Sequence, residues 1–200
     1  MSNPNKMVPL ELTDQIWNRL FTVHSLVVIG SREDNGDYNL APKHMAMPLG
    51  FENYFGFMGT SRKSTYHNIK REGVFTVSYP RPSQLIVTSL AASPREDDHT
   101  KPIVKKLPTS LAREIDGEFL DHSYLQLECK LDQILGQFGE WELIVGEVVA
   151  AYAHPDAVRK KSVDDNDLIF DAPLLAYLHP DRYAIVNRSQ AFPLPKNFKR

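Results

Sequence analysis

Hydrophobic and polar residues alternate along several segments of the chain, most regularly in its second half. Between residues 125 and 132, leucine or cysteine occupies every odd position and a polar residue every even one. A period of two is typical of a strand that buries one face and exposes the other. Short runs rich in β-branched and aromatic residues indicate further strands. The pattern predicts strands over residues 25–31, 53–58, 74–79, 125–131, 143–152 and 183–186.

The dipeptide Asn35-Gly36 is the strongest hairpin signal in the sequence. The tight turn that it favours takes positive φ at both central positions, which these residue types tolerate. We therefore expect segment 23–32 to pair with segment 37–41. A second turn is expected over residues 136–140, between the two long strands.

Helical signals are fewer and shorter. A helix is predicted over residues 63–72, because Gly73 stands where helices often end. Residues 83–92 also favour a helix, although they include several β-branched side chains. Residues 95–117 are charged and contain proline, so we expect loop with short helical pieces.

A short helix is also predicted near the N-terminus, where Thr13 can act as its cap. Helical spacing would place four hydrophobic side chains on its buried face. They are Ile16, Trp17, Leu20 and Phe21.

Many strands joined mostly by hairpins, with few helices, predict a mainly β fold that closes as an antiparallel barrel. A doubly wound sheet would need helices alternating with parallel strands, and the pattern does not supply them. The length of 200 residues fits one domain, with a core over about residues 20–186.

Composition indicates the class of protein and its cellular location but not the reaction it carries out. Hydrophobic residues make up 42% and charged residues 24%, and the net charge is -2, so bulk charge does not predict a nucleic-acid partner. Cys129 is the single cysteine, which rules out an intrachain disulfide. The first ten residues lack a signal-peptide core and no apolar run could span a bilayer. We expect a cytoplasmic protein without a membrane partner.

One cluster carries candidate binding chemistry. It lies where the helix over 63–72 should begin, and a helix start offers free N–H groups and partial positive charge to a phosphate. An arginine can grip phosphate oxygens with two parallel bonds, and hydroxyls can donate more. A solvated basic loop is the alternative interpretation of the cluster alone. The residues are Ser61, Arg62, Lys63, Ser64 and Thr65, with Asn68 one turn further on.

The preceding extended segment from Asn39 to Ala46 suits a planar heterocycle. Small side chains such as Ala41, and the neighbouring Pro42, allow a ring system to approach backbone N–H and C=O groups. The alternative is an ordinary second strand of the hairpin. Met45 and Met47 are more often core residues than cofactor contacts.

Taken in order, these segments resemble the flavin reductase-like family of FMN-binding split β-barrels. The shared features are the Asn-Gly turn, N-x-A-P-x-x-x-A, an aromatic strand, S-R-K-S-T-x-x-N-I and G-V-F-x-V-S. Two later strands are similar as well, one with a Leu-Glu-Cys core and one with the pattern W-x-L-x-x-G-E-V. The resemblance covers roughly residues 20 to 186, and the order of the motifs makes it specific.

The resemblance implies a homodimer that binds one FMN per protomer, partly at the subunit interface. It implies a ring-binding segment and a phosphate-binding cluster. The segment comprises Asn39, Leu40, Ala41, Pro42, His44, Met45 and Ala46, and the cluster comprises Ser61, Arg62, Lys63, Ser64, Thr65 and Asn68. The chain departs from the family at residues 49–53, where a D-P-P-like turn is usual, and this alters a loop near the flavin.

The expected function is an FMN-dependent oxidoreductase that takes hydride from NAD(P)H and passes electrons to free flavin, a partner protein or a small acceptor. The flavin supplies the reactivity and the protein supplies binding and orientation. No catalytic residue is assigned, but His44, His122 and His154 are candidates to stand beside a nicotinamide. The alternatives are an FMN-binding electron carrier or sensor without NAD(P)H activity, and a haem-binding split barrel.

Other cofactor sites are not indicated by the sequence. No two of the seven histidines stand three or four residues apart, so a zinc site is not predicted. There is no G-x-G-x-x-G motif, so a Rossmann nicotinamide site is not expected. Any NAD(P)H would have to bind over the flavin in an open groove.

Overall fold

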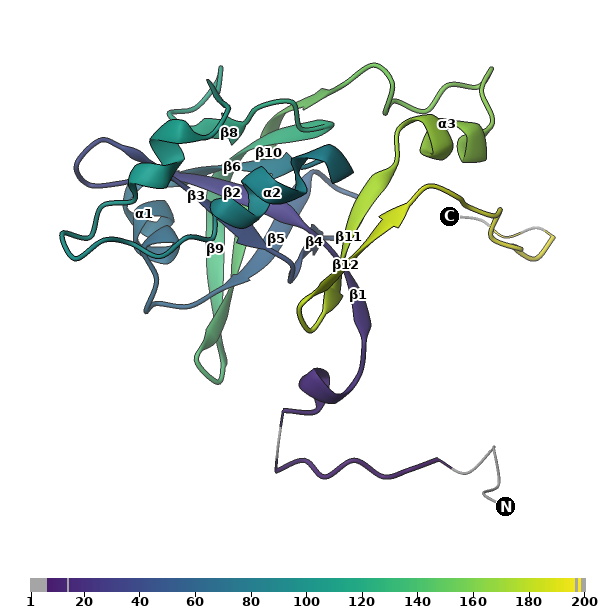
Figure 1. Cartoon of the computed structure of the whole chain (residues 1–200), viewed down its shortest axis with the longest axis horizontal. Helices are drawn as coiled ribbons and strands as arrows, with labels where there is room; N and C mark the ends of the chain where they lie inside the picture. The colour runs from purple at the N-terminus through teal and green to yellow at the C-terminus, as the bar shows by residue number, and fades with distance from the viewer. Residues whose placement is uncertain (1–6, 14, 197, 199–200) are drawn as a thin grey trace.

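The computed structural model describes residues 7–13, 15–196 and 198 of the chain (Figure 1). The strands are β1 Thr22–Ser25, β2 Val27–Arg32, β3 Tyr38–Lys43, β4 Ala46–Pro48, β5 Tyr54–Gly59, β6 Val74–Tyr79, β7 Thr109–Leu111, β8 Glu118–Leu120, β9 Leu125–Phe138, β10 Trp141–Ala153, β11 Leu174–His179 and β12 Arg182–Val186. The helices are η1 Ile16–Arg19, α1 Ser64–Glu72, η2 Pro82–Gln84, α2 Leu85–Leu90, η3 Pro102–Lys106 and α3 Asp165–Asp171.

Seven strands form the main antiparallel sheet, in the order β3-β2-β6-β9-β10-β5-β4. The two edge strands, β3 and β4, follow one another in sequence and are separated only by His44 and Met45. The sheet must therefore curl until its edges meet, which gives an antiparallel barrel that is split between β3 and β4. The expected mainly β barrel is confirmed, and the segment from Asn39 to Ala46 runs along the split.

The hairpin between β2 and β3 forms as predicted but with a different turn and register. Val27 pairs with Lys43 and Arg32 with Tyr38. In the turn, Glu33 N–H donates to Asp37 O at 2.7 Å and Gly36 N–H donates to Glu33 O at 3.1 Å. Gly36 alone takes positive φ, at 86°. The expected two-residue turn is therefore wrong, and a longer loop with one left-handed glycine replaces it.

Residues 22–25 do not extend β2, contrary to the predicted strand over 23–32. They form β1, which pairs with β11 in a separate sheet of the order β1-β11-β12 (Figure 1). Thr22 lies opposite His179 and Ser25 opposite Ala176. The sequence missed β4, β7 and β8 because three residues are too few to show a period. It missed β11 because five of its six residues are hydrophobic and do not alternate with polar ones.

The long hairpin β9–β10 extends further than the pattern predicted. β9 continues to Phe138, and the turn occupies Gly139, with φ of 67°, and Glu140. The alternation also fails at one position, because Glu128 is fully buried rather than exposed. Its Oε1 accepts from Arg113 N–H at 2.8 Å, and its Oε2 accepts from the two following amides at 2.7 and 2.9 Å. The buried carboxylate fixes the loop before β8.

Two of the predicted helices are confirmed. Helix α1 ends where Gly73, with φ of 70°, donates its N–H to Ile69 O at 2.9 Å. The segment over 83–92 forms η2 and α2. Helix α1 packs on β2, where Arg71 Nη2 donates to Arg32 O at 2.6 Å.

The predicted N-terminal helix is wrong in its cap and in its buried face. A single 3-10 turn, η1, begins after Gln15 and buries none of its residues. The side chains of Trp17, Leu20 and Phe21 are 62%, 50% and 68% exposed. The turn lies on an arm that leaves the body of the chain (Figure 1), and only Ile16 of the four predicted side chains is partly buried.

The barrel core lies inside the seven-stranded sheet and is closed by α1. Phe55, Phe57 and Phe75 are the largest side chains in it, and Ile69 of α1 joins them. Cys129 belongs to this core, and burial raises the pKa of its thiol to about 12. The thiol is therefore protonated at neutral pH and packs as an unreactive core group. Among the described residues, no helix is long and apolar enough to cross a membrane.

Candidate functional site

The first turn of α1 has backbone N–H donors that no side-chain cap accepts. Lys63 precedes the helix with extended backbone, and its side chain makes no capping bond. Within the described residues, the N–H groups of Ser64 and Thr65 have no hydrogen-bond partner, as expected for the first turn of a helix. These amides add partial positive charge at the same end. The helix therefore begins with the donors that an anion needs.

Asn39 joins this helix start to β3. Its Nδ2 donates to Thr65 Oγ1 at 3.1 Å, and both side chains are buried. Its Oδ1 accepts from Lys101 Nζ at 3.3 Å. The same ammonium donates to Leu40 O at 2.9 Å and to Ala91 O at 2.6 Å. Asn39 and Thr65, both predicted site residues, are thus in contact, and Lys101 fastens the segment after α2 to them.

Lys43 and Lys101 are the residues of this region that sequence reasoning missed as binding candidates. Burial, followed by repulsion from Arg95, lowers the pKa of Lys101 to about 8. Burial, followed by repulsion from Lys63, lowers the pKa of Lys43. Lys43 also contributes to the lowered pKa of Lys101. The cations crowd one another, which is unfavourable unless an anion binds between them.

Only Lys43 could have been found from the sequence, because it stands inside the small-residue segment. Lys101 lies 62 positions from Asn39 in a loop with no motif. A lysine in a charged, proline-bearing loop is usually exposed. The fold, rather than a sequence signal, brings it to the site.

The other members of the predicted phosphate cluster lie at or beside the helix start but differ in exposure. The side chain of Arg62 is 66% exposed and forms an ion pair with Glu140 in the β9–β10 turn. Ser61 is exposed, and its carbonyl accepts from His67 Nε2 at 2.6 Å. Arg62 is therefore free to exchange one anionic partner for another at little cost.

Asn68 faces the packing side of α1. Its Nδ2 donates to Ser31 Oγ of β2 at 3.2 Å, and its side chain is buried. Arg71 Nη1 donates to its Oδ1 at 3.4 Å. The amide is thus hydrogen-bonded within the chain, where it holds the helix on the sheet.

The predicted ring segment forms the edge of the sheet at the split. Among the described strands, β3 pairs only with β2, so the backbone groups on its other edge are available to a ligand, apart from the Leu40 carbonyl that accepts from Lys101. The side chain of Leu40 is buried in a second core cluster below α2 and η3. Ala41 and Pro42 are half-buried, and Ala46 is buried. The segment therefore presents backbone and small side chains, as expected.

His44 closes the end of the ring segment in a cluster of rings. Its imidazole stacks on Tyr177 with centroids 4.5 Å apart, and it lies 5.3 Å from His179 and 5.6 Å from His24. Burial, followed by repulsion from His179, lowers the pKa of His44 to about 4. The ring is therefore neutral at neutral pH. It can donate or accept a hydrogen bond but is no proton reservoir there.

The other two candidate histidines make their contacts elsewhere. His154 Nδ1 lies 2.6 Å from Asp156 Oδ1, and Asp156 also accepts from Arg81 at 2.6 Å. The side chain of His122 is 79% exposed beside Asp121. Within the part of the chain that the structure describes, neither histidine forms a hydrogen bond with the ring segment. Within the described residues, no group of three or more His, Cys, Asp or Glu side chains could hold a metal ion.

Comparison with known proteins places the chain among flavin-linked proteins. The family model for the flavin reductase like domain matches residues 20–183. A search of curated proteins finds no match. The structures with a similar fold include nitrilotriacetate monooxygenase component B from Bacillus cereus, with a TM-score of 0.78 and 17% identity, covering 95% of this chain and 100% of that one.

Two further solved structures have the same fold. Flavoredoxin from Methanosarcina acetivorans has a TM-score of 0.75 and 16% identity, covering 96% of this chain and 97% of its own. An FMN-binding protein from Thermus thermophilus with bound p-hydroxybenzaldehyde has a TM-score of 0.71 and 19% identity, covering 96% and 100%. At these identities the likeness is one of fold.

Proposed function

Because the chain belongs to the flavin reductase-like family, we propose that it binds FMN and acts as an NAD(P)H-dependent oxidoreductase. The observation that carries the proposal is the set of crowded cations around the uncapped start of α1. Lys63 repels Lys43 there, and Lys43 in turn repels Lys101. A phosphate monoester carries close to two negative charges at neutral pH, and it would relieve this repulsion.

The phosphate of FMN fits between α1 and β3. The free N–H groups of Ser64 and Thr65 would donate to it, together with the hydroxyls of both residues. Arg62 would leave Glu140 and grip two phosphate oxygens. The proposed phosphate site also includes Ser61, Lys63 and Asn68, because they lie beside the helix start or one turn beyond it. Asn39 and Lys101 would orient Thr65 and supply charge.

The isoalloxazine fits the edge of β3 at the barrel split. Backbone groups of Leu40, Ala41 and Pro42 would face its polar rim, because β2 pairs only with the other edge of the strand. Met45, Ala46 and neutral His44 would complete the wall. When bound, the flavin accepts a hydride from NAD(P)H and passes electrons to free flavin, a partner protein or a small acceptor. The residues named here bind and orient, and none has to carry a proton.

Absorption and binding measurements test the cofactor. The purified protein soaked with FMN should show flavin bands after gel filtration. FMN should bind more tightly than riboflavin, because only FMN carries the phosphate. Absence of flavin bands after soaking would remove the proposal. Steady-state oxidation of NADH and NADPH tests the activity, and no turnover with either would remove the reductase assignment.

A second candidate function is an electron carrier that takes its electrons from another protein. The observation that favours it is the open ring segment, where the side chains of Met45 and Met47 are 38% and 57% exposed. Such a site would let a protein partner approach. The carrier function predicts a tightly bound FMN that is reduced by dithionite but not by either nicotinamide.

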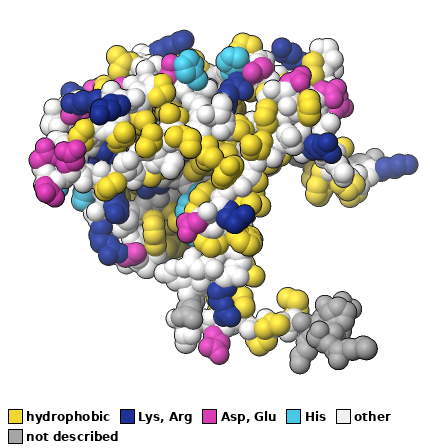
Figure 2. All heavy atoms as spheres, viewed as in Figure 1, with side chains coloured by type: hydrophobic (Ala, Val, Ile, Leu, Met, Phe, Trp, Pro, Cys, Tyr) yellow, Lys and Arg dark blue, Asp and Glu magenta, His cyan; other side chains and the backbone are white. Residues whose placement is uncertain are grey.

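We also propose that the protein forms a homodimer. Trp17, Phe21 and Val23, before the barrel, are 62%, 68% and 72% exposed. Figure 2 shows hydrophobic side chains on the arm that leaves the body of the molecule. A second copy would offer the same arm in return, so that the two arms cover each other's barrels. Three cavities of about 570 to 640 Å³ among the described residues are lined by residues outside Asn39–Ala46. A partner chain would supply the missing wall over the ring.

A further inference from the structure

Three histidines and one tyrosine meet where the small sheet β1-β11-β12 touches the barrel. His24 lies on β1, His44 in the corner between β3 and β4, and Tyr177 and His179 on β11. The His44 ring stacks on Tyr177 and on His179, with centroids 4.5 and 5.3 Å apart. His24 stands edge-on to the other two imidazoles, with centroids at 5.6 and 6.4 Å. These four residues form the ring cluster.

The ring cluster joins two sheets that share no ladder of backbone hydrogen bonds. Within the described residues, no backbone hydrogen bond runs between the strands of the small sheet and those of the barrel. Figure 1 shows the small sheet beside β4, and β1 contacts that strand. Side-chain packing therefore holds the small sheet against the barrel, and His44 provides the barrel's part of the stack.

The hydrogen-bond partners of the imidazoles are neutral. His24 Nε2 lies 2.8 Å from Thr22 Oγ1, and His179 Nε2 lies 3.0 Å from Asn18 Oδ1. Among the described residues, His179 Nδ1 is buried without a hydrogen-bond partner. Within the same residues, no carboxylate is hydrogen-bonded to an imidazole of the ring cluster. The ring cluster thus contains no anion that would balance an added proton.

The surroundings of His44 oppose a positive charge on its ring. Burial, followed by repulsion from His179, His24 and Lys43, lowers the pKa of His44 to about 4. Asp181, in the turn between β11 and β12, acts in the opposite direction and is the smallest of these influences. Burial, followed by repulsion from His179, also lowers the pKa of His24. An exposed imidazole titrates near pH 6.5, so both rings take up protons more readily when the ring cluster is open.

Acid therefore favours the open arrangement. Below about pH 6.5 the closed ring cluster binds fewer protons than an open one, and the free-energy difference grows as the pH falls toward 4. For His44 alone, the ratio of open to closed molecules should rise about 20-fold between pH 7 and pH 5. A proton on a second ring adds repulsion between two half-buried cations, which opens the ring cluster further.

We propose that the ring cluster is an acid-sensitive joint, which releases the small sheet from the barrel and loosens the end of the ring segment at His44. At neutral pH the stacked rings hold the corner between β3 and β4 in place. When the imidazoles are protonated, the small sheet moves away and this corner loses its support. The inference goes beyond the proposed function, because the ring cluster belongs to the chain itself and responds to pH without FMN.

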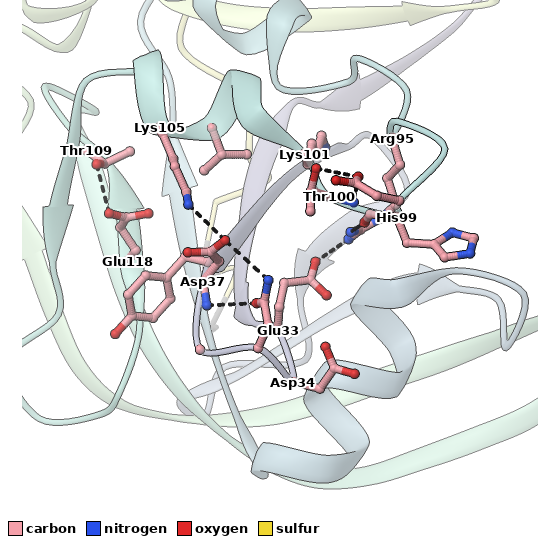
Figure 3. A pocket seen from close by; sticks show the side chains of 15 residues that line it. Glu33, Asp34, Asp37, Arg95, His99, Thr100, Lys101, Lys105, Thr109 and Glu118 are labelled. Carbon is pink, nitrogen blue, oxygen red and sulfur yellow. Dashed lines mark hydrogen bonds and ion pairs between the residues drawn. The ribbon is translucent and has the colours of Figure 1, made fainter.

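The other end of β3 supplies an internal reference. A cavity of about 620 Å³ lies there, between the β2–β3 turn and the loop that carries η3 (Figure 3). Arg95 forms an ion pair with Glu33, and Lys105 Nζ lies 3.0 Å from Asp37 Oδ2. These pairs join a cation to a carboxylate and involve no imidazole. Between pH 7 and pH 5 histidine is the side chain that ordinarily titrates, so this loop should stay closed.

Hydrogen–deuterium exchange of the full chain without added ligand, at pH 7 and pH 5, tests the joint. The rates are corrected for the slower chemical exchange at acid pH. We expect exchange over residues 43–48 and 174–179 to rise at least about tenfold at pH 5. Exchange over β6, β9 and residues 95–105 should change less than about twofold, because no imidazole holds these segments together.

The variant His44→Gln keeps a polar side chain of similar reach but cannot take up a proton. It should reduce the acid-dependent rise to less than about threefold. If His44 were only a packing residue, the variant would raise exchange at both pH values and leave the rise unchanged. His122→Asn removes a largely exposed histidine outside the ring cluster and is the matched control. It should keep the full rise.

An NMR titration of the imidazole groups of the parent chain does not depend on any variant. One imidazole should stay neutral down to about pH 5. Equal exchange at the two pH values, a set of imidazoles that all titrate near pH 6.5, or an undiminished rise in His44→Gln would each overturn the inference. A uniform rise over all segments would mean that the whole chain unfolds in acid, and it would overturn the inference as well. None of these results depends on FMN binding, so the proposed function is tested separately.

Discussion

Arg62 and Lys101 illustrate how single residues of the site differ in what they reveal. Arg62 stands in a recognisable motif and is largely exposed, while Lys101 has no motif and is half-buried, with its ammonium among oxygens of two segments, β3 and the end of α2. The first can be removed with little damage to the fold. The second reports on the site through its lowered pKa.

Replacing Arg62 by Ala should weaken FMN binding far more than riboflavin binding. A charge-assisted hydrogen bond contributes about 1.5–3 kcal/mol, and only FMN offers a phosphate to receive it. Fluorescence titration with both flavins measures the difference. Arg182→Ala, an exposed arginine on β12, is the matched control and should leave both affinities unchanged. Equal losses for FMN and riboflavin would show that Arg62 does not meet the phosphate.

The affinity for FMN should fall as pH rises through about 8. Lys101 has its pKa lowered from 10.5 to about 8, so it loses charge there unless an anion holds its proton. The slope can reach at most about tenfold per pH unit for one proton. Riboflavin should show no such fall. Titrations between pH 7 and 9.5 measure it, and Lys101→Arg, which stays charged, should remove it. An unchanged fall in that variant would exclude Lys101 as the cause.

The lowered pKa of Lys101 also makes the free energy of unfolding depend on pH. Between about pH 8 and 10.5 the unfolded chain binds more protons at Lys101 than the native chain does. The contribution of this residue to the free energy of unfolding therefore rises with pH across that window. Below pH 8 the buried charge is a cost that the protein carries without ligand.

At the level of elements, the sequence pattern predicted the strands and helices that are long enough, or clearly enough bounded, to show a repeat or an end signal. β6 has the predicted bounds, and α1 ends at the predicted Gly73. Short strands such as β4 and β8 were missed because three residues carry no period. Glu128 was placed on the exposed face because alternation counts residue type and cannot see the loop amides that cover it. The proposed ring segment could be predicted from local residue types, whereas Lys101 joins it only through tertiary structure.

Glu128 tests the role of one element in holding another. Replacing it by Gln puts an amide group against the N–H groups of the loop residues Arg113 to Ile115. Buried donors without acceptors cost about 1–3 kcal/mol each, so we expect a loss of at least about 2 kcal/mol in the free energy of unfolding. Urea denaturation measures it. Glu147→Gln, on an exposed position of β10, should change it by less than about 0.5 kcal/mol. A stable Glu128→Gln protein would mean that the loop does not depend on this carboxylate.

For the whole molecule, the exposed arm predicts assembly. Light scattering should give about twice the 22.8 kDa of one chain. The double variant Trp17→Ser/Phe21→Ser should shift the mass toward one chain and weaken FMN binding, because the ring site would lose its second wall. Ile86→Ser, which changes an exposed residue of α2, is the control. A monomeric parent that still binds FMN tightly would contradict the dimer and the shared site together.

The barrel split between β3 and β4 also bears on how freely this sequence can diverge. A ligand that binds to the backbone of an edge strand needs no particular side chain there, only side chains small enough to let it approach. Most positions along the split can therefore change while the shape of the binding edge persists. Chains that share the fold at 16–19% identity can keep the same ribbon of donors and acceptors. Sequence differences that matter for ligand choice should then be concentrated in the side chains around that binding edge. In this chain the ring cluster at His44 is such a place.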